Sequence, residues 1–359
     1  MISRVADHCF WFGRYLERAE STARLLQVTG SLAVDGDLSP LQCWQPVLIT
    51  EGEESHFAAL RGAEAMSDGE AVQEHLCFDL SVNASLIRSV GAARENARSI
   101  RETVSLEAWE SINELHLWMQ SPLARETFNE ERYSFYRHIR REAQLCLGLL
   151  RGTMLHDLPL DFIWLGVVLE RTGQTARILD VHHHAFTLAS EAGGIDPAAK
   201  PALDPTAAPA VVQVSHWLSL LRACYGFEPF MKTHRGTVTG QAVARFLLFE
   251  QRFPRSVRHC LKRAREWLAR IRPEGTRGLP LLTSLKRLLI LEAWLEARAG
   301  GPFDSASLHE ILTRVVDETH AACDEIAVEL LGAPPPPPPE PPTPPSPPQQ
   351  SQAQSSQTE

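Results

Sequence analysis

Two stretches of the chain place the same charged residues at the same spacing. WFGRYLERAESTARLLQV occupies residues 11–28, WLGVVLERTGQTARILDV occupies residues 164–181, and ten of the eighteen aligned positions are identical. Both copies contain a glycine, a Glu-Arg pair and a second arginine. Arginine binds carboxylate or phosphate through two parallel hydrogen bonds, and a glutamate can serve as a general base. The repeated residues therefore have the chemistry either of an anion-binding site or of a set of ion pairs.

The repeated residues share one face of an expected helix. Residues seven apart lie two turns apart on nearly the same side of a helix, so Gly13, Glu17 and Arg24 form a stripe with Arg18 on its flank. The second copy repeats this stripe with Gly166, Glu170, Arg177 and the flanking Arg171. Because a glycine lets another backbone approach closely, we expect the two copies to meet or to face each other.

Two interpretations of this set stay open. In the structural one, the charges form ion pairs that fix how two helices dock, which specifies geometry while adding little net stability. In the functional one, Arg18, Arg24, Arg171 and Arg177 line a cleft that binds an anionic group, and Glu17 or Glu170 is the catalytic base or an orienting residue. Since paired charges at helical spacing are common, the structural interpretation has more weight. Whether the chain is an enzyme is left undecided.

A second internal similarity occurs at a different offset. LCFDLSVNASLIRSVGAARE (residues 76–95) aligns with LLFEQRFPRSVRHCLKRARE (residues 247–266), and apolar residues recur at the same helical spacing in both. The pairs Arg94-Glu95 and Arg265-Glu266 recur with them and are further binding candidates. The Pro-, Ala- and Gly-rich insert at 191–210 explains the change of offset, because a loop insertion leaves the helices intact.

A basic segment and a histidine-rich segment are weaker candidates. Residues 245–298 contain thirteen Lys or Arg against five Asp or Glu, and Arg255 in this segment is a candidate for binding an acidic partner protein. A solvated helix face is the alternative. Asp180 and His184 are spaced as one side of a metal site, but no second metal-binding motif and no C-x-x-C pair occur. We therefore expect neither a metal nor a cofactor.

The residue pattern predicts an all-α fold. Apolar residues three or four apart predict a helix over 10–28 and an equivalent helix in the second copy. Strand patterns are nearly absent. The chain is expected to form a duplicated helical bundle whose halves, 1–155 and 156–332, pack as one compact domain. Further helices are expected at 40–50, 106–119, 130–151, 211–225, 279–299 and 307–331.

The composition excludes several classes of protein. The chain has 359 residues, 44% hydrophobic and 22% charged, which is typical of a soluble globular protein. A net charge of −9 argues against nucleic-acid binding, and the absence of a long apolar run argues against a membrane span. Seven scattered cysteines indicate a reducing cytoplasm. The Pro-rich segment 333–359 is expected to be a disordered tail.

Several separated motifs resemble one known family. SRVADHCFWFGRYLERAESTARLL, AARENARSIRETVSLEAWESIN and FLLFEQRFPRSVRHCL resemble the bacterial alpha-E family, which is named for a Glu-Arg motif, here Glu17-Arg18. The resemblance covers about residues 1–332 and excludes the Pro-rich tail. The family usually continues the first helix with a DV-x-x-H run, whereas this chain has QVTGSLAV there and keeps Asp180-Val181 and His184 only in the second copy.

The resemblance implies a function class rather than a reaction. Members of the family are uncharacterised and are associated with circularly permuted ATP-grasp ligases and transglutaminase-like cysteine peptidases. It therefore implies an accessory, binding or scaffold subunit of a peptide- or amide-ligase system, with such a ligase or peptidase as partner. A stand-alone enzyme that acts on the amide product through a Glu/Arg cleft is one alternative. A purely structural interaction module is the other, and self-association is left open.

Overall fold

The computed structural model describes residues 2–35, 38–192, 208–273, 276–301 and 305–334. All regular structure in these residues is helical, which confirms the all-α class. Most of the insert at 191–210, and the Pro-rich tail from residue 335 on, lie outside the described residues. No helix in the described part of the chain is long and apolar enough to cross a membrane.

The first half of the sequence begins with one long helix and continues with shorter ones. The long helix extends the predicted 10–28 segment to Ser3–Asp35. The helices of this half are α1 (Ser3–Asp35), α2 (Pro40–Glu51), α3 (Glu54–Arg61), the short 3₁₀ helix η1 (Ala63–Ser67), α4 (Gly69–Phe78), α5 (Leu86–Ser99), α6 (Leu106–Met119), α7 (Pro122–Glu130) and α8 (Arg132–Thr153).

The second half also begins with a long helix, α9, whose first turn contains Pro159. Its helices are α9 (Leu158–Ala192), α10 (Ala208–Ala223), α11 (Phe227–Thr233), α12 (Gly240–Phe249), α13 (Val257–Ile271), η2 (Thr276–Gly278), α14 (Thr283–Glu296), α15 (Ser305–Ile326) and the π-helical turn η3 (Ala327–Leu331).

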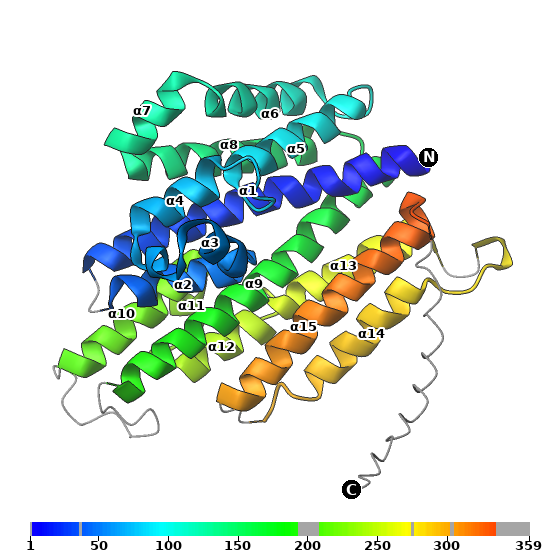
Figure 1. Cartoon of the computed structure of the whole chain (residues 1–359). Coiled ribbons are helices and arrows are strands. Elements are labelled where there is room, and N and C mark those ends of the chain that lie inside the picture. The colour runs from blue at the N-terminus through cyan, green and yellow to red at the C-terminus, as the bar shows by residue number, and fades with distance from the viewer. Residues whose placement is uncertain (1, 36–37, 193–207, 274–275, 302–304, 335–359) are drawn as a thin grey trace, which may run out of the picture.

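The two long helices α1 and α9 pack against each other through the centre of the molecule (Figure 1). Their closest approach is at the repeated glycines. A Cβ atom at Gly13 would lie 2.0 Å from the carbonyl oxygen of Ile163, and a Cβ atom at Gly166 would lie 2.1 Å from the carbonyl oxygen of Phe10. Each glycine therefore faces the other helix's backbone, and no other residue type fits at this crossing without displacing it.

Each long helix has its own set of packing partners. Helix α1 packs against α5 and α8, which lie in the upper layer of Figure 1, whereas α9 packs against α13 and α15 in the lower layer. Buried Leu, Val, Ile, Phe and Ala side chains from all these helices form one continuous core. The two central helices thus join the two layers, and the residues at their contact are enclosed on both sides.

The second internal similarity corresponds to a helix end, a turn and a helix start, not to one continuous helix. Helix α4 ends at Phe78 and α5 begins at Leu86, and in the second half α12 ends at Phe249 and α13 begins at Val257. Ser85 and Ser256 cap the following helices by accepting a backbone N–H bond. These matching boundaries are what a duplication predicts. The duplication and the division into halves at residue 155 stay predictions.

Candidate functional site

The repeated Glu-Arg pairs bond to each other across the α1–α9 contact. Arg171 donates from Nε and Nη2 to the two carboxylate oxygens of Glu17, at 2.9 and 2.7 Å. Arg18 donates from Nε and Nη2 to Glu170, at 2.7 and 3.0 Å. The glutamate of each copy is thus bound by the arginine of the other in a bidentate pair, the strongest geometry for these groups. The expected meeting of the two copies is observed.

Residues that the two copies do not share enlarge this cluster. Glu170 accepts a second arginine, Arg14, at 2.8 Å. Arg255, from the turn before α13, donates to Glu17 at 2.6 Å and to Glu20 at 3.0 Å. We call the whole set the Glu/Arg network; its members are Arg14, Glu17, Arg18, Glu20, Arg24, Glu170, Arg171 and Arg255.

The network is buried, and its carboxylates are held in the charged form. Glu17 and Glu20 are fully buried and Glu170 is 2% exposed. Burial alone would raise the pKa of Glu20, but Arg24 and Arg255 reverse this effect and hold the pKa at about 2. In the same way, Arg171 and Arg255 lower the pKa of Glu17, and Arg18 and Arg14 lower that of Glu170. Such carboxylates are poor bases at neutral pH.

These lowered pKa values predict a loss of stability in acid. A carboxylate whose pKa is lower in the folded state stabilises the fold at pH values above its pKa in the unfolded chain, here 4.5. It loses this contribution as the pH falls through its pKa in the folded protein. We expect the melting temperature to fall between about pH 4.5 and about pH 2, measured by circular dichroism. Glu95→Gln, which removes a half-exposed carboxylate, should leave this profile nearly unchanged. A melting temperature that does not change over this pH range would contradict the lowered pKa values of the buried glutamates.

Arg177 does not repeat the bonding of Arg24. Arg24 donates to Glu20, one turn earlier on the same helix, but the residue one turn before Arg177 is Gly173. Arg177 instead lies near Glu51 at the end of α2, where its charge opposes the burial that raises the pKa of Glu51 to about 7. The two copies of the stripe therefore differ at this end.

The other predicted residues lie apart from the network. Arg94 pairs with Glu95 and also donates to Asn113. In the second half Arg265 pairs with Glu292, and Glu266 pairs with Arg263. These are ion pairs on partly exposed helix faces, a type that adds little to stability.

Asp180 and several arginines of the basic segment have ion-pair partners within the protein. Asp180 accepts from His309 on α15 at 2.9 Å, and the side chain of His184 lies outside the described residues. Within the basic segment, Arg252 pairs with Glu250 and Arg258 pairs with Glu296. Arg255 is nearly buried, with 12% of its side chain exposed, and both its guanidinium contacts are internal.

A cavity of about 450 Å³ borders the network on one side. We call it the arginine cavity, because Arg24, Arg140 and Arg222 line it and Glu228 is its one acidic lining residue. Ring, hydroxyl, amide and aliphatic groups complete it: Gln27, Val28, Ser31, Leu32, Tyr133, Ser215, Ser219, Tyr225 and Phe227. The volume is that of a small-molecule site, and the lining suits an anionic group.

Tyr225 connects the cavity to the network. Its hydroxyl accepts from Arg140 at 2.7 Å, and the guanidinium carbons of Arg24, Arg140 and Arg255 lie 4.3, 5.1 and 5.0 Å from its ring centroid. Its φ of 55° is in the left-handed region, which a bulky residue adopts only where the surroundings impose it. Such conformations cluster at functional sites. The network has five arginines for three glutamates, so as a whole it carries a net positive charge.

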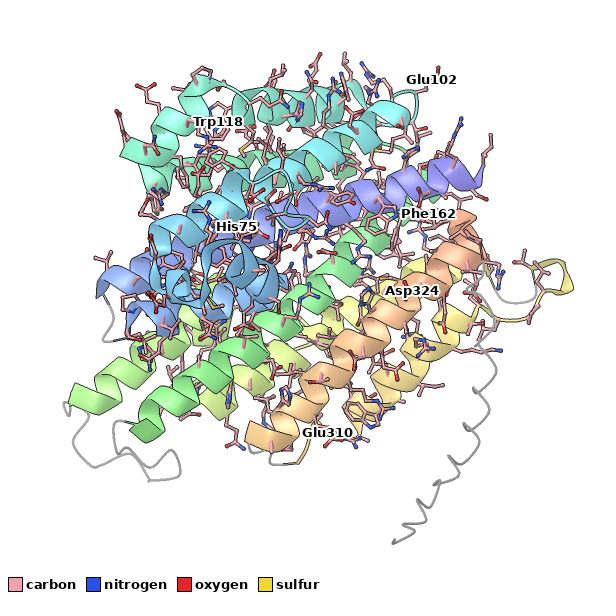
Figure 2. All side chains as sticks on the ribbon, viewed as in Figure 1. His75, Glu102, Trp118, Phe162, Glu310 and Asp324 are labelled. Atoms are coloured by element: carbon pink, nitrogen blue, oxygen red, sulfur yellow. The ribbon has the colours of Figure 1, made fainter. Side chains whose placement is uncertain are left out.

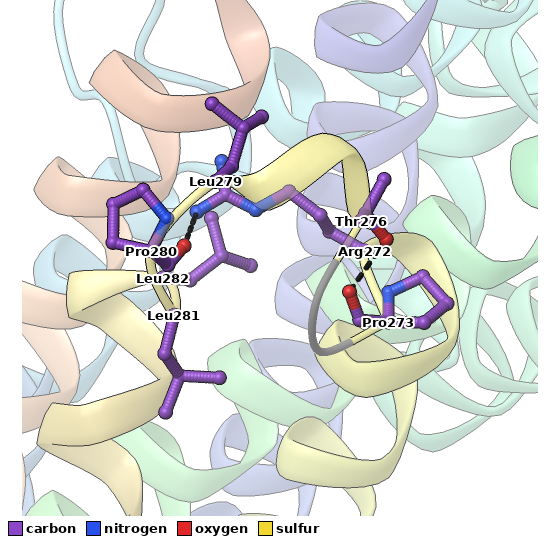
Figure 3. Close-up of a pocket in the computed structure, with 7 residues that line it drawn as sticks. All are labelled: Arg272, Pro273, Thr276, Leu279, Pro280, Leu281 and Leu282. Atoms are coloured by element: carbon purple, nitrogen blue, oxygen red, sulfur yellow. Dashed lines mark hydrogen bonds between the residues drawn. The ribbon is translucent and has the colours of Figure 1, made fainter.

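A smaller cavity of about 230 Å³ lies in the connection between α13 and α14 (Figure 3). Its charged lining residue, Arg272, donates to the carbonyl oxygen of Pro280 at 3.1 Å, and prolines and leucines form most of the wall. This lining offers little that could carry out a reaction.

The cysteines do not supply a nucleophile. All seven are free and buried. Burial raises the pKa of every thiol, for example to about 12 in Cys9 and to about 11 in Cys224. A thiol that stays protonated is a poor nucleophile.

Several members of the site escaped the sequence analysis because they are not repeated. Val167 and Gly173 occupy the second-copy positions that correspond to Arg14 and Glu20. Spacing offered a signal, since Arg14 and Arg18, and Glu20 and Arg24, are four residues apart and share a helix face. Tyr225 and Arg140 gave no such signal, because only tertiary structure brings them to α1.

Taken together, the fold and the network define an all-helical protein whose two long central helices are joined by reciprocal Glu-Arg pairs. The sequence model of a family described as a predicted alpha-helical domain with a conserved ER motif matches residues 1–330. The chain therefore belongs to the Alpha-E family, and Glu17-Arg18 and Glu170-Arg171 are Glu-Arg pairs of the kind that this description names.

Relatives are found in mycobacteria. Uncharacterised proteins of Mycobacterium bovis and of two strains of Mycobacterium tuberculosis are each 24% identical over 277 residues. The match covers 73% of this chain but 29% of each relative, so the chain spans less than a third of their length. No solved structure matches the chain.

Proposed function

We propose that the protein is a cytoplasmic accessory subunit of an ATP-grasp peptide- or amide-ligase system. In this role it binds a carboxylate-bearing peptide or acyl group in the arginine cavity and presents it to the ligase. The observation that carries the proposal is the cavity itself, which three arginines line against one glutamate. The ligase partner comes from the association typical of the Alpha-E family.

The state of the Glu/Arg network favours a binding role over catalysis. Glu17 and Glu170 each accept bidentate bonds and have lowered pKa values, so neither is available as a base. Arg222 differs from the network arginines: it is exposed, it lies 4.9 Å from the Phe227 ring, and no carboxylate in the described residues pairs with it. This arginine is free to bind a ligand.

The lengths of the mycobacterial relatives support a role beside other protein parts. In those proteins the matched region is joined to more than twice its own length of further chain. A helical unit inside a longer chain is suited to work next to other domains. The proposed ligase would be such a neighbour.

Affinity capture from the native cell tests the partnership. We expect the wild-type protein to recover an ATP-grasp ligase in the presence or absence of ATP, identified by mass spectrometry. The Arg141→Ser variant, which changes an exposed arginine of α8 outside the cavity, should recover the same partner. Capture of no ligase under either condition would exclude the accessory role.

Ligand binding tests the cavity independently of any partner. We expect calorimetry with triglutamate to show that Arg222→Ser weakens binding by about ten- to hundredfold, because a hydrogen bond to a charged group contributes about 1.5–3 kcal/mol. Arg141→Ser should bind as wild type does. Inorganic phosphate, titrated in parallel, distinguishes a carboxylate site from a phosphate site. Equal binding by all three proteins would contradict the proposed site.

A further inference from the structure

Three potential metal ligands meet where α3 packs near α4, away from the groups discussed above. Glu53 precedes α3, His56 lies in the first turn of α3, and His75 lies in α4. One ligand atom from each lies within 4.8 Å of the other two. Figure 2 shows His75 among the short helices of the first half. Glutamate and histidine three residues apart share one side of a helix, so both can reach the same ion.

The distances suit a small ion with nitrogen and oxygen ligands. His56 Nδ1 lies 2.9 Å from Glu53 Oε2, and His75 Nε2 lies 3.8 Å from the same oxygen. Ligands of a tetrahedral zinc ion, with bonds of about 2.0–2.1 Å, are about 3.3 Å apart. The two observed separations lie on either side of that value, so small side-chain movements complete the geometry.

Packing alone does not explain why a histidine occupies position 75. It is fully buried, and its Nε2 makes no hydrogen bond. The corresponding residue in the second half is Phe246, which packs edge-on against Phe230 with ring centroids 5.4 Å apart. His75 packs edge-on against Phe57 in the same manner, with centroids 4.9 Å apart. Since phenylalanine fills this place, a buried histidine whose Nε2 makes no hydrogen bond indicates a ligand at that nitrogen.

The second nitrogen of His75 has the partner that metal-binding histidines usually have. Nδ1 lies 3.2 Å from the carboxylate of Asp79, the C-cap residue of α4. A carboxylate on the far side of the ring fixes the tautomer and directs the lone pair of Nε2 toward the metal. Asp79 is itself held by bonds from the backbone N–H and the hydroxyl of Ser81.

We propose that Glu53, His56 and His75 bind one divalent transition-metal ion of the zinc class, with Asp79 orienting His75. The site is of the open kind. Three protein ligands leave one tetrahedral position for water, and 41% of the His56 side chain is exposed, so solvent reaches the ion from that side. The ion connects α3 to α4 and places a Lewis-acid centre outside the Glu/Arg network. This inference does not depend on the proposed ligase partnership.

Zinc titration of the untagged full-length protein tests the site. We expect one equivalent of Zn²⁺ to bind and to raise the melting temperature. His75→Phe, which copies the second-half packing, should fold and melt at or above the temperature of the zinc-free wild type, but zinc should no longer raise it. His56→Ala should also lose binding. Asp79→Asn, which keeps an oxygen for Ser81, should bind about ten- to hundredfold more weakly.

Two controls place the ion in this site. His309→Ala changes an exposed histidine elsewhere and should bind zinc as wild type does. Cobalt(II) should give the visible spectrum of nitrogen and oxygen ligands, without a thiolate charge-transfer band. The proposal is overturned if the wild type binds no zinc, or if cobalt shows thiolate ligation. It is also overturned if His75→Phe still binds zinc and His184→Ala does not.

Discussion

Replacing Gly13 with alanine is expected to destabilise the protein strongly, although it adds a single methyl group. The new Cβ would lie 2.0 Å from the carbonyl oxygen of Ile163, which is backbone and cannot rotate away. Helices α1 and α9 must therefore separate. Their separation also pulls apart the bidentate ion pairs that cross their contact. Overpacking of this kind costs about 1–3 kcal/mol and sometimes more. We expect the upper end of that range or beyond, measured by urea unfolding.

Helix α1 supplies its own control for this substitution. Gly30 is on the same helix, and no atom outside the helix lies within 4 Å of the position of its missing Cβ. Gly30→Ala should raise stability by about 0.5–1 kcal/mol, because alanine favours the helical state. Gly166→Ala should behave like Gly13→Ala, since its Cβ meets the Phe10 carbonyl at 2.1 Å. If Gly13→Ala were as stable as Gly30→Ala, the close helix crossing would be wrong.

Removing the carboxylate of Glu17 is the second change with a large expected effect. Glu17→Gln leaves Arg171 without its carboxylate and Arg255 with Glu20 as its remaining one, in a nearly buried setting. Breaking a buried ion pair by removing one partner costs about 3–5 kcal/mol. The surface variant Glu95→Gln should cost at most about 1 kcal/mol, because its partners are solvated. Thermal and urea unfolding measure both.

A compensated variant separates the structural role of this network from a direct role in function. Glu17→Leu combined with Arg171→Met removes the pair and leaves Arg255 bonded to Glu20. It should recover most of the lost stability, since no charge remains unpaired. If this variant complements normally in the native cell, the only role of these two residues is to hold α1 and α9 together. A stable variant that fails to complement would show that their charges have a further function.

The fold class was predictable because it depends on local pattern. The apolar spacing of residues 10–28 persists in its second copy, and spacing of three and four residues buries one side of a helix and no side of a strand. Cap residues such as Ser39, which accepts a bond from the Gln42 backbone, also act through neighbours in sequence. The repeated glycine predicted a close backbone approach for the same reason, since its lack of a side chain is a property of the residue itself.

Only the tertiary structure decided which glutamates pair with which arginines and that these pairs form a buried network. Neighbouring residues such as Glu17 and Arg18 do not face each other on a helix, so their partners depend on where the other helix crosses. That crossing pairs Glu17 with Arg171, adds Arg255 from a turn 238 residues away, and buries Glu17 fully and the two arginines nearly so. Burial then sets the chemistry, because a carboxylate enclosed by arginines is a fixed charge and not a base.

The arginine cavity and the proposed metal site depend on the fold in the same way. Tyr225 reaches the cavity from the turn between α10 and α11, and Arg140 reaches it from α8. His75 joins Glu53 and His56 only because α4 folds back beside α3. No periodicity in the sequence links these residues, since their spacing is set by loops and helix lengths. The sequence by itself therefore determined the helices and the contact of the repeated stretches. The packing of those helices determined the ion pairs, the cavity and the ligand cluster, because each requires side chains from distant segments to converge.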